Sequence, residues 1–456
     1  MPDRSPSRWL LFAVAVTVVV RVSIMWVTAD RFTADPDAYL GLAQTLADHG
    51  VFGLLSAEGR PQPTAFRPPL YPAVLAFCLA VPWSARTAIT VLHLLLAVLT
   101  SILVFLTGRR MASPIQAPAS RFNASAAGGL AAVLIALDPI LVRQSTEIMT
   151  ETLAATLSIA VLWAWGGWID AERPARRLVL AGALGGLMAL AYLCRPTFLV
   201  WAALVCAAML WIGARRRDLT SAMVAAAIVA IVVGGWTFRN WRAVGHPVWA
   251  TTHGGYTLLL ANNESFYQYL QQGRFGTAWD ATSFLRAYDH RYEGDPRTES
   301  FWQRNWKGKP IIDPAITEHQ DDRLAYEAAV ATIRRHPGLF CWSMVVRVGR
   351  LWSPFPHGVA SRSRVAVWAV GGFYVVVYAL MLWAAWRHRW SLLQPRWWAV
   401  WALVLALTAV HAVYWSNLRM RAPAMPALVI LASLSLLPSR HRHGSSGTVI
   451  ADADAR

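Results

Sequence analysis

The chain has 456 residues, of which 56% are hydrophobic and only 15% are charged, and its formal net charge is +17. So little charge cannot cover so much apolar side chain in water, which excludes a soluble globular domain and predicts an integral membrane protein. The positive charge does not indicate a nucleic-acid partner, because the arginines cluster in short connections between apolar runs. That distribution fits membrane topology and contact with anionic membrane lipid.

Ten apolar runs approach the roughly 20 residues that a membrane-spanning helix needs. In chain order they are 9–29, 86–107, 126–143, 151–168, 178–194, 197–213, 219–237, 364–386, 397–415 and 424–438. The first run is too long for the apolar core of a signal peptide and lacks a small-residue cleavage site, so we expect it to be retained as a span. The sequence therefore predicts an all-α polytopic membrane protein.

The placement of arginine predicts the topology. Four arginine-rich connections fall on one side of the alternation together with both termini, namely 108–122, 169–177, 214–218 and 387–396. The positive-inside rule then places both termini in the cytoplasm of a multi-pass protein of the inner or plasma membrane. We expect four parts: an N-terminal transmembrane module 1–237 with a first outer loop 30–85, an outer-face segment 238–363, C-terminal transmembrane helices 364–438, and a disordered cytoplasmic tail 439–456.

Helical spacing of apolar residues among arginines within 238–363 favours helices that lie in the membrane interface. The first outer loop contains two close carboxylates. Asp35 precedes Pro36, as an N-cap precedes a proline at the first helical position, and the apolar spacing that follows predicts an interfacial helix ending at His49 and Gly50. In this interpretation Asp35 only caps the helix, and Asp37 is an acid in its first turn that interacts favourably with the helix dipole. The alternative is that the two carboxylates are functional residues.

Other polar residues also allow two interpretations. Arg67 stands before two prolines that stiffen the chain at the outer interface, where it either snorkels to lipid headgroups or binds a ligand. Glu151 opens an apolar run as a first-turn acid capped by Thr150, or as a second functional acid. Asn262 and Asn263 either end a turn or hydrogen-bond a ligand.

Nothing in the sequence indicates a metal or another cofactor. The four cysteines lie in or beside apolar runs without metal-ligand spacing and are interpreted as packing residues. No histidines pair at ligand spacing, and His253, before two glycines, is interpreted as structural. Arg21, inside the first apolar run, is expected to snorkel or to pair with another helix.

Five motifs follow one another along the chain: "ADPDAYLGLAQTLADHG" with "TAFRPPLYP", then "TETL", "LCRPTFL", "WTFRNWRAVGHPVWATTHGGYTLLLANN" and "RMRAPAMP". Their order resembles the GT-C glycosyltransferases, and more narrowly the bacterial relatives of protein mannosyltransferases and lipid A aminoarabinose transferases (glycosyltransferase family 39-like). The resemblance covers most of the chain. It implies a GT-C fold with interfacial helices and an outer-face loop region.

The resemblance also implies an activity, the transfer of a hexosyl or pentosyl group from a polyprenyl-phosphate donor to a protein, lipid or cell-envelope glycan on the outer face. A first-loop aspartate would be the general base; its spacing from the following tyrosine points to Asp35, while Asp37 leaves the choice open. A single base with direct displacement predicts inversion. The candidate catalytic residues are Asp35, Asp37 and Glu151, and the candidate substrate-binding residues are Arg67, Tyr71, Arg195, Arg239, Asn262, Asn263, Arg419 and Arg421.

Two other functions compete with this one. A transporter or flippase of lipid-linked sugars would favour internal repeats and ionisable groups at the bilayer midplane, whereas the candidate acids stand at one interface and no repeat is visible. A polymerase or ligase that uses a diphosphate-linked oligosaccharide is equally compatible with the long outer segment.

Overall fold

The computed structural model describes residues 5–28, 32, 34–115, 123–273, 277–309, 315–357 and 363–438. These residues are mostly helical, and the strands among them are the short antiparallel pair β1 (Gly53–Leu55) and β2 (Pro61–Pro63). The all-α fold class is therefore confirmed. The tail expected at 439–456 lies outside the described residues.

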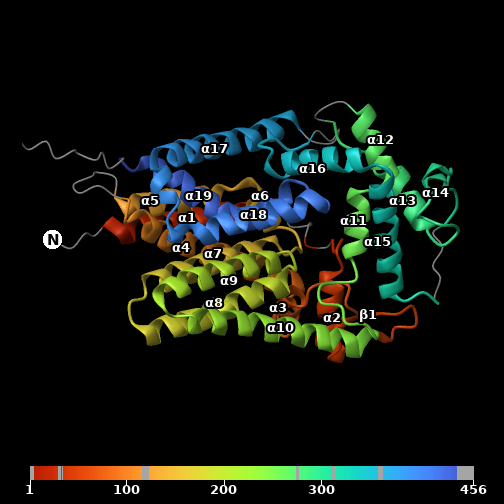
Figure 1. Cartoon of the computed structure of the whole chain (residues 1–456), viewed down its shortest axis with the longest axis horizontal. Coiled ribbons are helices and arrows are strands. Elements are labelled where there is room, and N and C mark those ends of the chain that lie inside the picture. The colour runs from red at the N-terminus through yellow and green to blue at the C-terminus, as the bar shows by residue number, and fades with distance from the viewer. Residues whose placement is uncertain are drawn as a thin grey trace, which may run out of the picture.

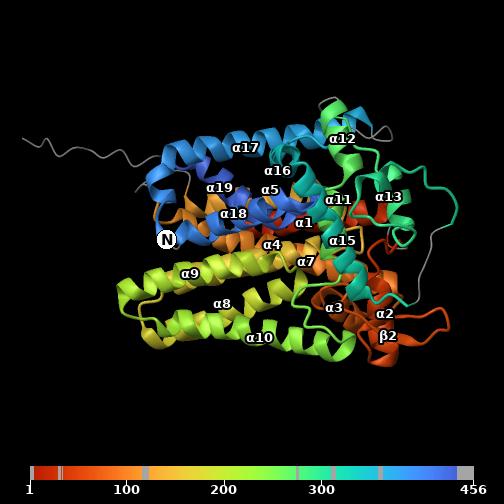
Figure 2. The same cartoon turned by 45° about the vertical axis from the view of Figure 1, so that its right-hand side comes forward.

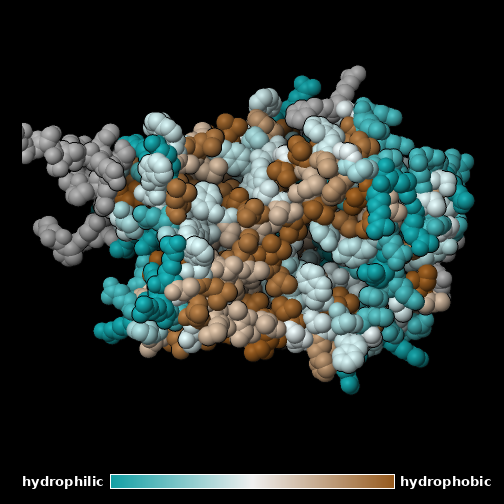
Figure 3. Space-filling model, in the orientation of Figure 1, coloured by the Kyte–Doolittle hydropathy of each residue, from teal (hydrophilic) through white to brown (hydrophobic). Residues whose placement is uncertain are grey.

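Eight helices are long and apolar enough to cross a membrane. They are α1 (Ser5–Val27), α4 (Ala85–Ala112), α7 (Glu151–Asp170), α8 (Pro174–Cys194), α9 (Phe198–Arg216), α10 (Thr220–Val244), α17 (Arg364–Leu392) and α18 (Trp398–Val413, extended by the 3₁₀ turn η2, Pro395–Trp397). They run along the long axis of the molecule (Figures 1 and 2). Figure 3 shows apolar side chains gathered over the middle of this bundle and hydrophilic ones at its two ends, the surface of a multi-pass membrane protein.

Two of the ten expected spans are not single helices of spanning length. The run 126–143 is divided into α5 (Ala124–Leu137) and α6 (Pro139–Gln144), because a proline disfavours helical conformation in the residue before it. That residue, Asp138, instead accepts a hydrogen bond from the Leu141 N–H at 2.9 Å and starts the second helix. The run 424–438 forms only the short α19 (Met425–Ser433), between the 3₁₀ turns η3 (Leu418–Ala424) and η4 (Leu434–Leu436).

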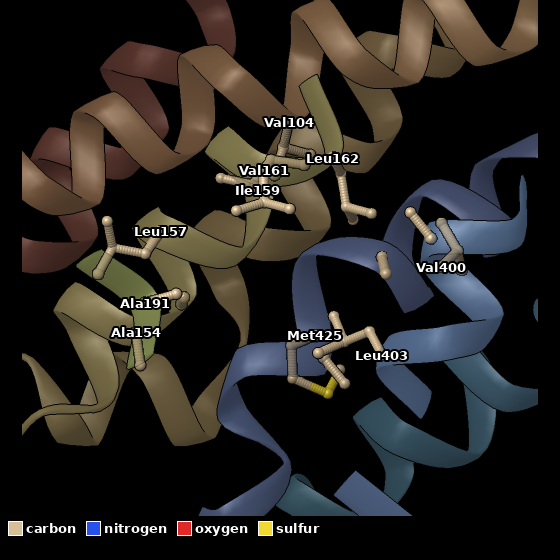
Figure 4. Packing of buried hydrophobic residues seen from close by; sticks show 14 of the residues in the cluster. Val104, Ala154, Leu157, Ile159, Val161, Leu162, Ala191, Val400, Leu403 and Met425 are labelled. Atoms are coloured by element: carbon tan, nitrogen blue, oxygen red, sulfur yellow. The ribbon is translucent and has the colours of Figure 1, made fainter. Parts of the chain in front are cut away.

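The core of the bundle surrounds α7, in which 83% of the apolar window is buried, against 17–50% in the other seven spans. In a membrane an apolar helix can be enclosed either by lipid or by other helices, and α7 is the span that other helices enclose. Figure 4 shows Ile159 and Leu162 of α7 between Val104 of α4 and Val400 of α18, with Met425 of α19 nearby. The N-terminal end of α7 is thus held firmly at one end of the bundle, where Glu151 stands.

Short elements cover that end of the bundle (Figures 1 and 2). They are α2 (Tyr39–His49), the β1–β2 hairpin, α11 (Gly254–Ala261), α12 (Glu264–Gln272), α13 (Thr282–Asp289), α14 (Glu299–Gln303) and α15 (Glu318–Arg335); α3 (Leu70–Leu79) and α16 (Pro337–Trp352) lead back along the bundle. The helical conformation expected within 238–363 is confirmed as α11–α12 and α15–α16, and the position of these helices in the membrane interface stays a prediction. Because α10 continues to Val244, the expected boundary at 237 falls inside a helix; the remaining division into parts stays a prediction.

Buried arginines bind the ends of helices. Arg21, Arg347 and Arg421 have no acid at ion-pair distance among the described residues, and each is at most 3% exposed. Arg21 donates to a carbonyl near the C-terminal end of α5, Arg347 to carbonyls at the ends of α11 and α18, and Arg421 to two at the end of α16. The partial negative charge of a helix C-terminus compensates the guanidinium there. The expectation that Arg21 pairs with another helix is confirmed.

Candidate active site

The two aspartates of the first loop lie in a tight turn and not in a helix. The helix expected to start at Pro36 begins at Tyr39, after Ala38, whose φ of 59° is left-handed. The Ala38 N–H donates to the Asp35 carbonyl at 3.2 Å, which closes the turn. The helix ends at His49 as expected, with Gly50 at φ 66°.

Asp35 caps α2 from outside the N-cap position. Its Oδ2 accepts a hydrogen bond at 2.9 Å from the N–H of Gly41, the third residue of the helix. Its Oδ1 is buried and has no hydrogen-bond partner among the described residues. One oxygen of this carboxylate, Oδ2, therefore stabilises the helix, and the other, Oδ1, is available to a ligand.

Asp37 forms an ion pair with Arg67. The Arg67 Nη2 donates to Asp37 Oδ1 at 2.7 Å and its Nε donates to the Asp37 carbonyl at 3.0 Å. The guanidinium carbon also lies 4.4 Å from the ring centroid of Phe66, and the arginine side chain is only 13% exposed. Arg67 is thus held at a fixed place and does not extend freely toward headgroups. The expected first-turn role of Asp37 is wrong, because this ion pair keeps it in the turn.

Arg239 and Glu318 fasten the first loop on both sides. Arg239, on α10, donates to the carbonyls of Thr64 at 2.6 Å and Phe52 at 2.7 Å. Glu318, the first residue of α15, accepts hydrogen bonds from the Ala65 N–H at 2.8 Å and from the Thr64 hydroxyl. Arg239, a candidate for substrate binding, is therefore engaged in holding the loop three residues before Arg67.

A second charged cluster surrounds Glu151. This carboxylate is 1% exposed, and its Oε1 lies 3.1 Å from Arg419 Nε and 3.4 Å from Arg195 Nη2. Glu151 and Arg419 form an ion pair, but the geometry between them is not that of a hydrogen bond. The other carboxylate oxygen of Glu151, Oε2, has no hydrogen-bond partner among the described residues. Glu151 does open α7 as expected, but Thr150 makes no capping hydrogen bond. Three candidate residues from distant parts of the chain are thus brought together.

Tyr39 connects the two clusters. Its phenol interacts electrostatically with Arg67 and Asp37 of the first cluster and with Arg195 and Glu151 of the second. Burial raises the pKa of Tyr39 to about 12, so that the hydroxyl stays neutral and can donate a hydrogen bond. Tyr39 therefore stands near both clusters, and its ring centroid lies 5.6 Å from the guanidinium carbon of Arg67. Sequence reasoning missed Tyr39, although it stands two residues after Asp37.

Four of the candidate substrate-binding residues are fully buried and make contacts within the protein. Tyr71 is fully buried, and its hydroxyl pairs with the His93 ring at 2.9 Å. Asn262 and Asn263 are also fully buried; each amide donates to helix carbonyls of α11, and Asn263 caps α12. The turn-ending interpretation of the two asparagines is confirmed. Arg421 is fully enclosed at the end of α16, with its guanidinium carbon 4.1 Å from a tyrosine ring centroid.

Two further residues lie beside the first cluster. The ring of His253 lies 4.9 Å from that of Phe66 and 4.9 Å from that of Tyr256. The phenol of Tyr256 interacts electrostatically with Arg67 and Asp37. The close pairing of α11 with α15 places them there: the Gly255 N–H donates to Asp322 at 2.6 Å, and a side chain at Gly255 would collide with the backbone of α15. Sequence reasoning missed Tyr256 and gave His253 only a structural role.

No three His, Cys, Asp or Glu side chains in the described part of the chain gather as a metal site would require. The expectation that no metal takes part is not tested by this finding and stays a prediction.

Replacing Glu151 with Ala is expected to lower the free energy of unfolding by about 3–5 kcal/mol, because two guanidinium groups would lose their buried acid. Denaturation of the detergent-solubilised protein, followed by tryptophan fluorescence, measures the change. Glu327→Ala is the control: its pair with the well-exposed Arg297 contributes little to stability. Equal effects of the two variants would contradict a buried ion cluster.

The Asp322 carboxyl predicts a pH dependence of stability. Burial raises its pKa to about 6. Since the folded pKa lies above the unfolded one, the stability that this group contributes is present below about pH 4 and is lost as the pH rises through 6. Asp322→Asn, which keeps an oxygen for Gly255, is expected to raise the melting temperature at pH 7.5, with a gain that shrinks toward pH 4.

The neighbouring acid provides the control for this prediction. Asp321 accepts two hydrogen bonds from Arg291, at 2.6 and 3.1 Å. Asp321→Asn is therefore expected to lower the melting temperature at pH 7.5. A lower melting temperature for Asp322→Asn at the same pH would show that its carboxylate is stabilising and would overturn the prediction.

The fold described above is the GT-C glycosyltransferase fold that the motifs indicated. It is similar to the oligosaccharyltransferase of Archaeoglobus fulgidus in the apo form, with a TM-score of 0.52 and 16% sequence identity over 95% of this chain and 50% of that one. The same enzyme tethered with an acceptor peptide gives a TM-score of 0.51 and 14% identity over 95% and 49%. The chain thus spans about half the length of these oligosaccharyltransferase chains.

A further similar structure is that of ArnT from Cupriavidus metallidurans bound to undecaprenyl phosphate, with a TM-score of 0.44 and 16% identity over 94% of this chain and 77% of that one. No protein-family model matches the sequence, and no curated protein matches it. The likeness to the oligosaccharyltransferase, at 14–16% identity, extends to the fold alone.

Proposed function

We propose that the protein is a membrane glycosyltransferase that moves a sugar from a polyprenyl-phosphate donor to a protein, lipid or glycan acceptor on the outer face. One observation carries the proposal: Arg67 pairs with Asp37 beside the half-free carboxylate of Asp35, at a polar end of the apolar bundle. A polyprenyl-phosphate keeps its tail in lipid and its sugar at headgroup depth. Its reactive bond would therefore lie at the depth of these residues.

Arg67 would bind the phosphate of the donor. The bond that breaks joins the sugar C1 to a phosphate oxygen, so negative charge grows on the departing polyprenyl phosphate. A fixed guanidinium with a planar fork of donors stabilises that charge and lowers the barrier. The Asp37 carboxylate occupies this fork in the structure. The donor phosphate would take the place of this carboxylate, while the hydrogen bond from Arg67 Nε to the Asp37 carbonyl keeps the arginine oriented.

Asp35 is the better candidate for the general base, since its Oδ1 has no partner among the described residues whereas Asp37 is engaged by a cation. The acceptor hydroxyl or amine would give its proton to Asp35 while its oxygen or nitrogen bonds to C1 from the face opposite the phosphate. One displacement of this kind inverts the anomeric centre and needs no covalent sugar–enzyme intermediate.

The Glu151 cluster would support the same step. One carboxylate faces two guanidinium groups, those of Arg195 and Arg419, which leaves a net positive charge near the donor. Glu151 fixes the positions of the two arginines, so that little reorganisation is needed when an anionic lipid binds.

Mass spectrometry of cells with and without the protein tests the proposal. Loss of the protein is expected to cause accumulation of a polyprenyl-phosphate monosaccharide and to leave one class of envelope molecule without its sugar. The Asp35→Asn/Asp37→Asn double variant is expected to lose transfer in detergent, where transport has no meaning. Accumulation of a diphosphate-linked oligosaccharide would instead indicate a polymerase or ligase. Retained transfer by the double variant, with loss of lipid-linked sugar translocation in vesicles, would indicate a flippase.

A further inference from the structure

We infer that Phe66, His253 and Tyr256 form the wall of a subsite for the sugar ring of the donor. Their side chains form a continuous row that starts at Arg67. The guanidinium carbon of Arg67 lies 4.4 Å from the Phe66 ring centroid, Phe66 meets His253 edge-on at 4.9 Å and 75°, and His253 stacks on Tyr256 at 4.9 Å and 29°. The inference rests on the proposed function, because it takes Arg67 as the phosphate ligand.

The position of the row matches the shape of a glycosyl phosphate. The sugar is joined to the phosphate through a single oxygen, so its ring must lie within a few ångströms of the cation that holds the phosphate. The three aromatic residues begin at that cation, and each is partly exposed. Aromatic faces accept the C–H-rich faces of sugar rings, as apolar walls of ligand sites do.

The polar edges of the row are unused by the fold. No hydrogen bond joins either ring nitrogen of His253, or the hydroxyl of Tyr256, to another described residue. Burial and the charge of Arg67 lower the pKa of His253 to about 3, so its imidazole is neutral at working pH. A neutral imidazole offers one donor and one acceptor, which matches a sugar hydroxyl that can both donate and accept.

The row is also rigidly supported. The Thr252 N–H donates to the Ala65 carbonyl at 3.0 Å, which ties the segment before His253 to the segment before Phe66. The ring of Tyr256 is further held edge-on by that of Tyr288 at 4.9 Å. A subsite whose walls are fixed before the ligand arrives loses little entropy on binding.

Binding of bare and glycosylated carriers tests the inference. The probes are undecaprenyl phosphate and its mannosyl, glucosyl and arabinosyl derivatives, titrated against the full-length protein in detergent. The wild type is expected to bind at least one derivative about tenfold more tightly than the bare carrier, which corresponds to about 1.4 kcal/mol. Tyr256→Leu and His253→Leu are each expected to reduce this ratio to about one while the affinity for undecaprenyl phosphate is unchanged.

The variants distinguish a sugar contact from a packing role. Tyr256→Phe keeps the ring and removes the hydroxyl, so it is expected to retain part of the preference. His246→Ala, a change in the histidine pair His246–His319 that lies outside the row, is the control and should keep all of it. Equal loss of bare and glycosylated carriers in the leucine variants would mean that these residues only support the fold, and would overturn the inference.

The inference and the proposed function fail in different ways. If the wild type transfers sugar and the leucine variants keep the full preference for a glycosylated carrier, the subsite is wrong and the glycosyltransferase proposal stands. If the wild type neither prefers nor transfers any of the three sugars, both are overturned.

Discussion

Asp35→Asn is expected to lower the turnover of sugar transfer by roughly 10²–10⁴-fold, the contribution of a positioned general base. Donor binding should stay near that of the wild type, because the amide oxygen can still accept the Gly41 N–H that anchors the turn. Transfer from a radiolabelled polyprenyl-phosphate sugar, with donor affinity measured separately, tests both expectations.

The matched control is Asp37→Asn, two residues away in the same turn. This change keeps the proposed base and removes the negative charge that Arg67 contacts at 2.7 Å. Turnover is expected to fall less than in Asp35→Asn, and the affinity for undecaprenyl phosphate is expected to rise because the guanidinium loses its competitor. A larger fall in turnover for Asp37→Asn would exchange the roles of the two aspartates.

Arg67→Ala is the second change with a large expected effect. Loss of a positioned donor to the developing anion is expected to lower turnover by about 10²–10³-fold and to weaken binding of undecaprenyl phosphate. Arg67→Lys is expected to recover part of both, since an ammonium keeps the charge but lacks the planar fork. Steady-state transfer and titration of the bare lipid measure the two effects.

The exposed Arg86 is the control for this change: Arg86→Ala should leave both quantities near the wild type. Because Arg67 also holds the turn through Asp37, a melting temperature is needed for each variant. Unchanged turnover and lipid affinity in a folded Arg67→Ala protein would remove the phosphate ligand from the proposed function.

The two aspartates illustrate how far local sequence rules reach. The position before a proline predicted that Asp35 caps a helix starting at Pro36, but α2 begins at Tyr39. A cap rule considers only neighbours in the chain, whereas the turn is held by Arg67, 30 residues further on. The carboxylate of Asp35 still accepts a hydrogen bond from an N–H in the first turn of the helix. The capping role of Asp35 was therefore predicted correctly, whereas the residue at which the helix begins was not.

The sequence by itself determined the membrane class, the helical fold, the eight long apolar helices and the presence of Asp35, Asp37 and Arg67 in one loop. These depend on hydrophobicity summed over about 20 neighbouring residues or on short motifs, which are local properties. Only the tertiary structure decided which charges meet. It brings Glu151 into contact with Arg419, 268 residues further along the chain, and it buries Asn262 completely. Ion pairs and burial of this kind depend on how the helices pack against one another.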